Sequence, residues 1–257
     1  MTLTRRRFLA TSATAAGGIT VLPFAARAAT DAADRFETPA GGIIVHPVAH
    51  ATVVLETPQG TIYVDPVGAP AQYRGFPEAD LVLITHEHGD HFDIGTLDAI
   101  VEERTQLIMN PAVRAKMEGR FADHSTQLAN GEITTFRQIS IEAIPAYNTT
   151  QDRLNFHPQG RDNGYVLSFE GFRLYLSGDT EDIPEMRGLQ DIDLAFVCMN
   201  LPFTMDANAA ASAVSEFAPT YCYPYHYRGR DGGTQDPERF ARMVGGEVEV
   251  KFGDWYG

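Results

Sequence analysis

The feature that most constrains this chain is a short apolar run that leads directly into a histidine-rich loop. Leu81–Ile84 is apolar without alternation, and residues 85–91 (T-H-E-H-G-D-H) follow at once. Such a run predicts a strand buried on both faces. Of the chain's 8 histidines, His86, His88 and His91 fall within this loop, so a solvated loop that holds them by chance is a poor explanation. Imidazole and carboxylate are the usual ligands of zinc, iron and manganese, and the loop therefore predicts a metal site.

The spacing within the loop also indicates how the ligands are divided. Residues two apart in an extended backbone project to the same side, so His86 and His88 can share one ion. Gly89 allows a sharp turn, after which Asp90 and His91 can face a neighbouring site. The loop alone therefore offers ligands for two adjacent metal positions.

The rest of the chain alternates strand-like and helix-like segments. We expect strands where short runs of β-branched and aromatic residues lie between turn residues. The expected strands are 43–45, 52–55, 61–64, 81–84, 139–144, 165–169, 172–176, 194–198, 221–223 and 247–251, and the expected helices are 94–103, 111–118, 208–217 and 237–243. The pattern predicts one mixed α/β domain over residues 41–257.

The N-terminal segment predicts an export signal. Residues 5–9 (R-R-R-F-L) precede an alanine-rich apolar stretch and a small-x-small site at residues 26–28 (A-R-A), an arrangement that resembles a twin-arginine signal peptide. We expect a signal peptide over residues 1–28, a linker over 29–40, a twin-arginine translocase as partner, and a periplasmic or otherwise exported mature protein. The alternatives are a cytoplasmic protein with a basic start, or an uncleaved anchor. Glycine and proline interrupt the apolar stretch, which makes it a poor membrane span, so we expect no stable span in the mature form.

Charge and cysteine content exclude several classes of protein. A net charge of −14 and a pI near 4.9 argue against a nucleic-acid partner, which would need clustered Lys and Arg. The expected partner is a small-molecule substrate. Cys198 and Cys222 lie on apolar stretches and favour two buried thiols over a disulfide.

Later motifs reinforce the first. H-x-H-x-D-H after an apolar strand, S-G-D-T at 177–180, Y-P-Y-H-Y at 223–227 and D-P at 65–66 together resemble the metallo-β-lactamase superfamily. H-A-T at 50–52 is similar to a branch that includes L-ascorbate phosphate lactonase and N-acyl-phosphatidylethanolamine phospholipase D. The resemblance implies an α/β fold of the αβ/βα four-layer sandwich type, with the metals at one edge.

The resemblance also implies the ligand set and the chemistry. His86 and His88 would bind the first metal, Asp90, His91 and His226 the second, and Asp179 would bridge them. The cofactors would be two divalent ions, with zinc expected first and manganese or iron as alternatives. Two adjacent cations can lower the pKa of a shared water, and the resulting hydroxide would attack an ester, lactone or phosphodiester. Asp90, Asp179 and His157 are the expected catalytic residues.

Other functions are weighed against this one. A β-lactam substrate is disfavoured, because true β-lactamases of this fold generally lack the bridging aspartate, whereas Asp179 is present. An iron-dependent redox enzyme of the same fold is the first alternative, although the di-iron reductases carry glutamate in place of His88. A metal-binding module without catalysis is the second alternative, and the complete ligand set argues against it.

One position departs from the superfamily. The first metal commonly takes a third histidine from a strand end between the two main motifs, but residues 144–148 end in Asn148. His157 follows nine residues later. We expect His157 to fold back as third ligand or as proton donor, while Asn148 or water remains an alternative ligand. His46 and His124 are expected to be structural, and His50 is a candidate for orienting a ligand.

Overall fold

The computed structural model describes residues 33–229 and 235–256. The predicted signal peptide, residues 1–28, lies outside the described residues. The prediction of a linker over residues 29–40 is wrong in its second half, because Asp34–Thr38 forms strand β1. This strand pairs antiparallel with the next one and buries Phe36 in the core. Its polar composition predicts a linker, but pairing with β2 and the burial of Phe36 make the segment a strand.

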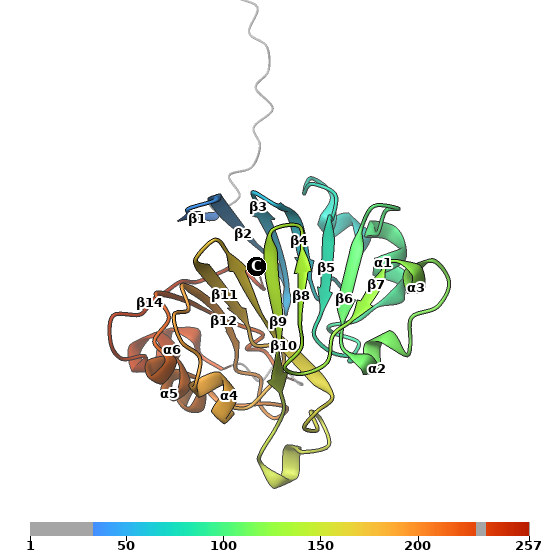
Figure 1. Cartoon of the computed structure of the whole chain (residues 1–257). Coiled ribbons are helices and arrows are strands. Elements are labelled where there is room, and N and C mark those ends of the chain that lie inside the picture. Colours follow the sequence, from blue (N-terminus) through green and yellow to red (C-terminus); the bar gives the residue numbers. More distant parts are fainter. Residues whose placement is uncertain (1–32, 230–234, 257) are drawn as a thin grey trace, which may run out of the picture. The chain divides into compact units, whose positions relative to one another are not determined.

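Fourteen described strands form two sheets of seven (Figure 1). The first sheet runs in chain order: β1 (Asp34–Thr38), β2 (Gly41–Ala49), β3 (Thr52–Thr57), β4 (Gly60–Val64), β5 (Leu81–Ile84), β6 (Gln106–Met109) and β7 (Ser125–Gln127). The second sheet has the order β14 (Glu249–Val250), β13 (Tyr221–Tyr225), β12 (Leu194–Cys198), β11 (Phe172–Leu176), β10 (Asp162–Phe169), β9 (Ile139–Ala146) and β8 (Ile133–Phe136). In each sheet the strands that come first in the chain pair antiparallel and the later strands pair parallel. The parallel part begins at β4 in the first sheet and at β11 in the second.

The alternation of side chains within each strand creates the layers. In β5, Leu81 and Leu83 face the core between the sheets, whereas Val82 and Ile84 belong to a second apolar cluster on the other face. That cluster is covered by α1 (Ile94–Ile100), α2 (Pro111–Arg114) and α3 (Arg120–Asp123). The second sheet is flanked by α4 (Pro184–Arg187), α5 (Ala207–Phe217) and α6 (Pro237–Met243) (Figure 1). The predicted four-layer αβ/βα sandwich is confirmed.

The ends of α1 follow local backbone and capping interactions rather than the hydrophobic pattern. The Asp93 side chain accepts hydrogen bonds from the backbone N–H groups of Gly95 and Thr96 and so begins α1. The helix ends at Ile100 and not at Glu103 as predicted, because Val101 is extended and buried. No helix within the described ranges is long and apolar enough to cross a membrane.

Both cysteines are free, buried thiols, as the sequence favoured. Cys198 on β12 pairs with Tyr225, whereas Cys222 on β13 pairs with Ala195. The two thiols therefore stand at different heights along neighbouring strands and do not face each other.

The topology brings distant polar residues to one edge. Carboxyl ends of parallel strands meet at the same edge of a sheet. Asp65 follows β4 and residues 85–91 follow β5 in the first sheet, while Asp179, Asn200 and His226 follow β11, β12 and β13 in the second. The connection from β9 to β10 adds His157 to the same edge.

Candidate metal centre

The histidine loop is held by Asp65, a buried aspartate that the sequence analysis noted only as part of the D-P motif. Leu81–Ile84 is fully buried, as predicted. Asp65 accepts hydrogen bonds from the backbone N–H of Thr85 at 2.7 Å and from its hydroxyl at 2.6 Å. His91 Nδ1 lies 2.8 Å from Asp65 Oδ2. Because a carboxylate only accepts, Nδ1 carries the proton and the Nε2 lone pair of His91 is left for a metal ion.

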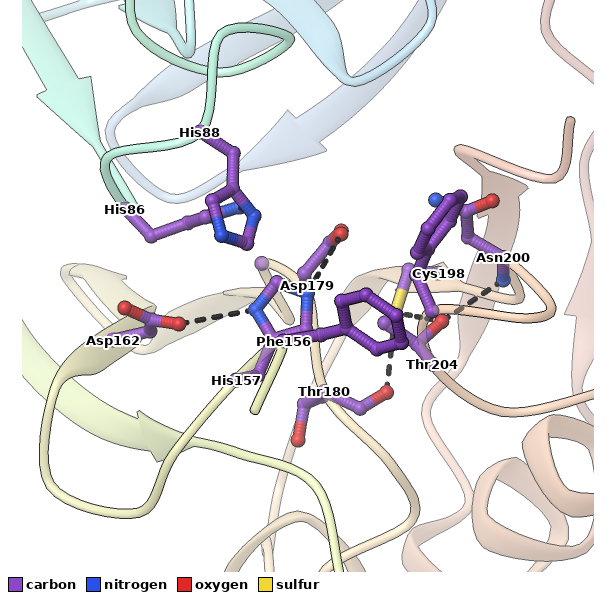
Figure 2. Close-up of polar contacts among 12 residues, drawn as sticks. His86, His88, Phe156, His157, Asp162, Asp179, Thr180, Cys198, Asn200 and Thr204 are labelled. Carbon is purple, nitrogen blue, oxygen red and sulfur yellow. Dashed lines mark hydrogen bonds and ion pairs between the residues drawn. The ribbon is translucent and has the colours of Figure 1, made fainter. Parts of the chain in front are cut away.

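Three histidines form a first group of ligand atoms. Ligand nitrogens of His86, His88 and His157 lie within 4.8 Å of one another, and His86 Nε2 is 3.1 Å from His88 Nδ1. His157 Nδ1 meets Asp162 Oδ2 at 3.0 Å, which turns Nε2 toward Asp179 Oδ2 at 3.4 Å (Figure 2). Burial lowers the pKa of His86 well below its usual range, so its imidazole is neutral and able to act as a ligand.

A second group lies on the other side of Asp179. His91 Nε2 is 3.0 Å from His226 Nε2. Asp179 Oδ1 is 3.3 Å from His226 Nε2 and 3.5 Å from His91 Nε2. Asp90 Oδ2 is 3.6 Å from His226 Nε2. One oxygen of Asp179 thus faces the second group while the other faces His157, which is the arrangement a bridging carboxylate needs.

These separations fit metal ions. Ligand atoms about 2.1 Å from one ion stand about 3.0 Å apart in octahedral geometry and about 3.4 Å apart in tetrahedral geometry. The individual separations given above, from 3.0 to 3.6 Å, fall in or close to this range. Asp179 Oδ1 is also buried without a hydrogen-bond partner among the described residues, with only the imidazole nitrogens of His226 and His91 at longer range, and a cation would fill this coordination. The donor set of imidazoles and carboxylates suits zinc, manganese or iron.

The electrostatic field of the centre favours positive charge. Burial disfavours a charged His226, but the carboxylates of Asp179 and Asp90 outweigh burial and raise the pKa of His226 to about 10. Burial likewise opposes protonation of His157, yet Asp162 and Asp179 raise its pKa to about 9. Without metal these imidazoles hold protons that a cation would displace, so metal binding is expected to release protons.

His50 joins the centre at its exposed side. Its Nε2 lies 3.3 Å from Asp90 Oδ2, and its Nδ1 lies 2.9 Å from the hydroxyl of Tyr256. Both His50 and Asp90 are also close enough to His226 to form a third group of ligand atoms. His50 therefore either orients Asp90, as the sequence suggested, or adds to the donor set. No group of this kind in the described part of the chain includes His46 or His124.

Asn148 shapes the loop that carries His157. Its side-chain nitrogen donates to the carbonyl oxygens of Arg153 at 2.9 Å and Phe203 at 2.7 Å. Its backbone N–H donates to the carbonyl oxygen of His157 at 2.8 Å. The residue that replaces the expected histidine thus connects the two ends of the loop, and His157 lies beside His86 and His88.

The sequence did not indicate the residue that anchors this loop. Glu181 is buried, and its Oε2 accepts the backbone N–H groups of Thr149 and Thr150, each at 2.7 Å. Its Oε1 accepts Arg153 Nη1 at 2.6 Å. Burial alone would raise the pKa of Glu181, but the hydrogen bonds from Thr150 and Thr149 lower it to about 2. Glu181 is two residues beyond Asp179, so one segment contributes to the metal centre and also anchors the loop.

Residues 45–226 match the family model of the β-lactamase superfamily domain. The chain belongs to the metallo-β-lactamase superfamily. A UPF0173 metal-dependent hydrolase of Thermococcus kodakarensis is 33% identical over 180 residues, which are 67% of this chain and 78% of the relative. The protein is therefore a metal-dependent hydrolase of this superfamily, as the motifs predicted.

Solved structures agree with this assignment. The structure of a metal-dependent hydrolase from Parabacteroides distasonis is 38% identical and has a TM-score of 0.78, with 87% of this chain and 99% of that chain covered. The metallo hydrolase Igni18 from Ignicoccus hospitalis, at 19% identity and a TM-score of 0.68 over 82% of this chain and 94% of that chain, shares the fold.

Proposed function

We propose that this metal-dependent hydrolase binds two divalent metal ions and cleaves an ester, lactone or phosphodiester of a small-molecule substrate. The single observation that carries the proposal is Asp179, whose two carboxylate oxygens face two separate groups of imidazoles. Zinc is the first expectation, with manganese or iron as alternatives. The proposal that the chain is similar to the branch that includes L-ascorbate phosphate lactonase rests on H-A-T at residues 50–52.

Each residue has a proposed role. His86, His88 and His157 would hold the first ion, Asp90, His91 and His226 the second, and Asp179 both. When bound, the ions supply an activated water and polarise the bond to be cleaved. The Asp90 side chain is 46% exposed, against 3% for Asp179. Asp90 is therefore the more accessible of the two carboxylates and would lie on the open side of the centre.

The experiment is metal analysis of the purified protein together with hydrolysis of a p-nitrophenyl ester, a lactone and bis(p-nitrophenyl) phosphate, before and after chelation. We expect two ions per chain and hydrolysis of at least one class, which is lost on chelation and restored by metal. A protein that binds fewer than two ions, or whose hydrolysis survives full removal of metal, would contradict the proposal.

We further propose that a twin-arginine translocase exports the protein to the periplasm and that cleavage occurs after Ala28, on the evidence of residues 5–9 and 26–28. N-terminal sequencing of the protein from a periplasmic fraction tests this proposal. An intact Met1 on a cytoplasmic protein would refute it.

His157 is expected to be the third ligand of the first ion. Loss of a residue that only supports a ligand already costs about 10- to 100-fold in metal affinity, so His157→Ala should weaken the first site at least that much. Asn148→Ala keeps all three imidazoles and is expected to retain both ions while losing about 1–2 kcal/mol of stability. The number of metal ions that each variant binds decides whether His157 or Asn148 is the third ligand. If Asn148→Ala loses an ion that His157→Ala retains, the ligand is Asn148.

A further inference from the structure

A buried asparagine that the proposed function does not use lies against the second group of ligands. Asn200 follows β12 and is only 2% exposed. Its backbone N–H donates to Thr204 Oγ1 at 2.9 Å (Figure 2), and its carbonyl oxygen accepts the backbone N–H groups of Phe203 and Thr204. This turn fixes the position of the Asn200 backbone, and hence the reach of its side chain.

The Asn200 side chain is only half satisfied. Its Nδ2 lies 3.3 Å from His226 Nε2, while its Oδ1 is buried without a hydrogen-bond partner among the described residues. Buried amides normally satisfy both ends, because an unpartnered polar atom costs free energy. The chain beyond His226 also approaches this turn closely, since a Cβ added to Gly229 would stand 2.0 Å from the carbonyl oxygen of Leu201. The amide can therefore rotate in place, but it has little room to move away.

The observed orientation of the amide is incompatible with a bound ion. If His226 Nε2 gives its lone pair to a metal ion, it can exchange no hydrogen bond with Asn200. An N–H group directed at a cation is also repelled by it. The oxygen and nitrogen of the amide have nearly the same shape, so a half-turn of the group exchanges them without disturbing the packing. The separation of 3.3 Å is also that of two ligand atoms on one ion.

We propose that Asn200 is a further ligand of the second metal position, with its side-chain oxygen directed at the ion held by Asp90, His91 and His226. This inference rests on the proposed two-metal function. The second position would then have the oxygens of Asp90, Asp179 and Asn200 beside two imidazoles, whereas the first has three imidazoles and a single carboxylate. Because carboxylate and carbonyl oxygens suit manganese, whereas imidazole suits zinc, the two positions would differ in metal preference.

The test is titration of the metal-free protein with Co²⁺, followed by its visible absorption spectrum, which reports the ligands of the ion without any substrate. The variants are Asn200→Ala, which removes the oxygen, and Asn200→Asp, which retains one. The matched control is Asn163→Ala, since Asn163 is also fully buried but has both amide atoms partnered, by Leu128 and Asn130. The folding of every variant is checked by thermal unfolding of the metal-free form.

We expect Asn200→Ala to bind the second equivalent of Co²⁺ about 10- to 100-fold more weakly, with an altered spectrum. Asn200→Asp should restore the affinity, and Asn163→Ala should keep the wild-type spectrum. An Asn200→Ala protein with the wild-type affinity and spectrum would overturn the inference, even if its turnover falls, because the residue would then act only on substrate. If the wild-type protein itself binds fewer than two ions, the proposed two-metal function is wrong, and not only the role of Asn200.

Discussion

Asp179→Asn is expected to lower kcat about a thousandfold while the protein still folds. Bound metal ions contribute several kcal/mol of transition-state stabilisation, and about 1.4 kcal/mol corresponds to a factor of ten. Asparagine preserves the shape of the side chain but removes the negative charge that faces both groups of imidazoles. Steady-state kinetics and metal analysis of the purified variant provide the measurement.

The control for this variant is Asp193→Asn. Asp193 precedes β12, at the opposite end of that strand from the metal centre, and it accepts the backbone N–H of Arg173 at 2.7 Å. Asparagine can accept the same hydrogen bond, so this variant should retain both its ions and its kcat. Near-normal kcat in Asp179→Asn would refute the assignment of Asp179 as bridging ligand.

Glu181→Ala is expected to destabilise the fold and weaken the first metal site together. The substitution leaves the backbone N–H groups of Thr149 and Thr150 without their acceptor, and it leaves Arg153 Nη1 with only the carbonyl oxygen of Thr204. Removal of one partner of a buried ion pair costs about 3–5 kcal/mol, and we expect about 3 kcal/mol because the Arg153 side chain is 29% exposed. For a protein of this size that amounts to a fall in Tm of roughly 6–12 °C.

The affinity for metal distinguishes a residue that anchors the loop from one that only stabilises the fold. Since the anchored loop carries His157, Glu181→Ala should bind the first ion at least about tenfold more weakly. Glu181→Gln keeps an acceptor for the N–H groups. Its Tm and its affinity for the first ion should therefore lie between those of the wild-type protein and of Glu181→Ala. The control is Glu185→Ala, because Glu185 is an exposed carboxylate that meets the hydroxyl of Tyr147 at 3.0 Å, at the start of the same loop. Glu181→Ala with the Tm and metal affinity of Glu185→Ala would contradict the anchoring role.

Local patterns were sufficient to predict most of the fold. The strand at Leu81–Ile84, the hairpin of β10 and β11 and the helix α5 each depend on neighbours a few residues away, for which periodicity and turn residues are reliable signals. The expected strands did not include β6, β7 or β8, and the prediction was also wrong at Asp34–Thr38, because a short polar edge strand has no pattern of its own. Only its pairing with β2 and the burial of Phe36 make it a strand.

The sequence by itself determined the family, the four-layer fold and the residues of the histidine loop, because these are recorded in short continuous motifs. Only the tertiary structure decided how the loop of His157 is held, and that Asn200 lies at the centre. The contacts that decide these points join Arg153 to Glu181, 28 residues away, and Asn148 to Phe203, 55 residues away. No spacing rule connects such residues. They meet because the two sheets place the carboxyl ends of their parallel strands at one edge, where a buried carboxylate or amide must find its partner from another segment of the chain.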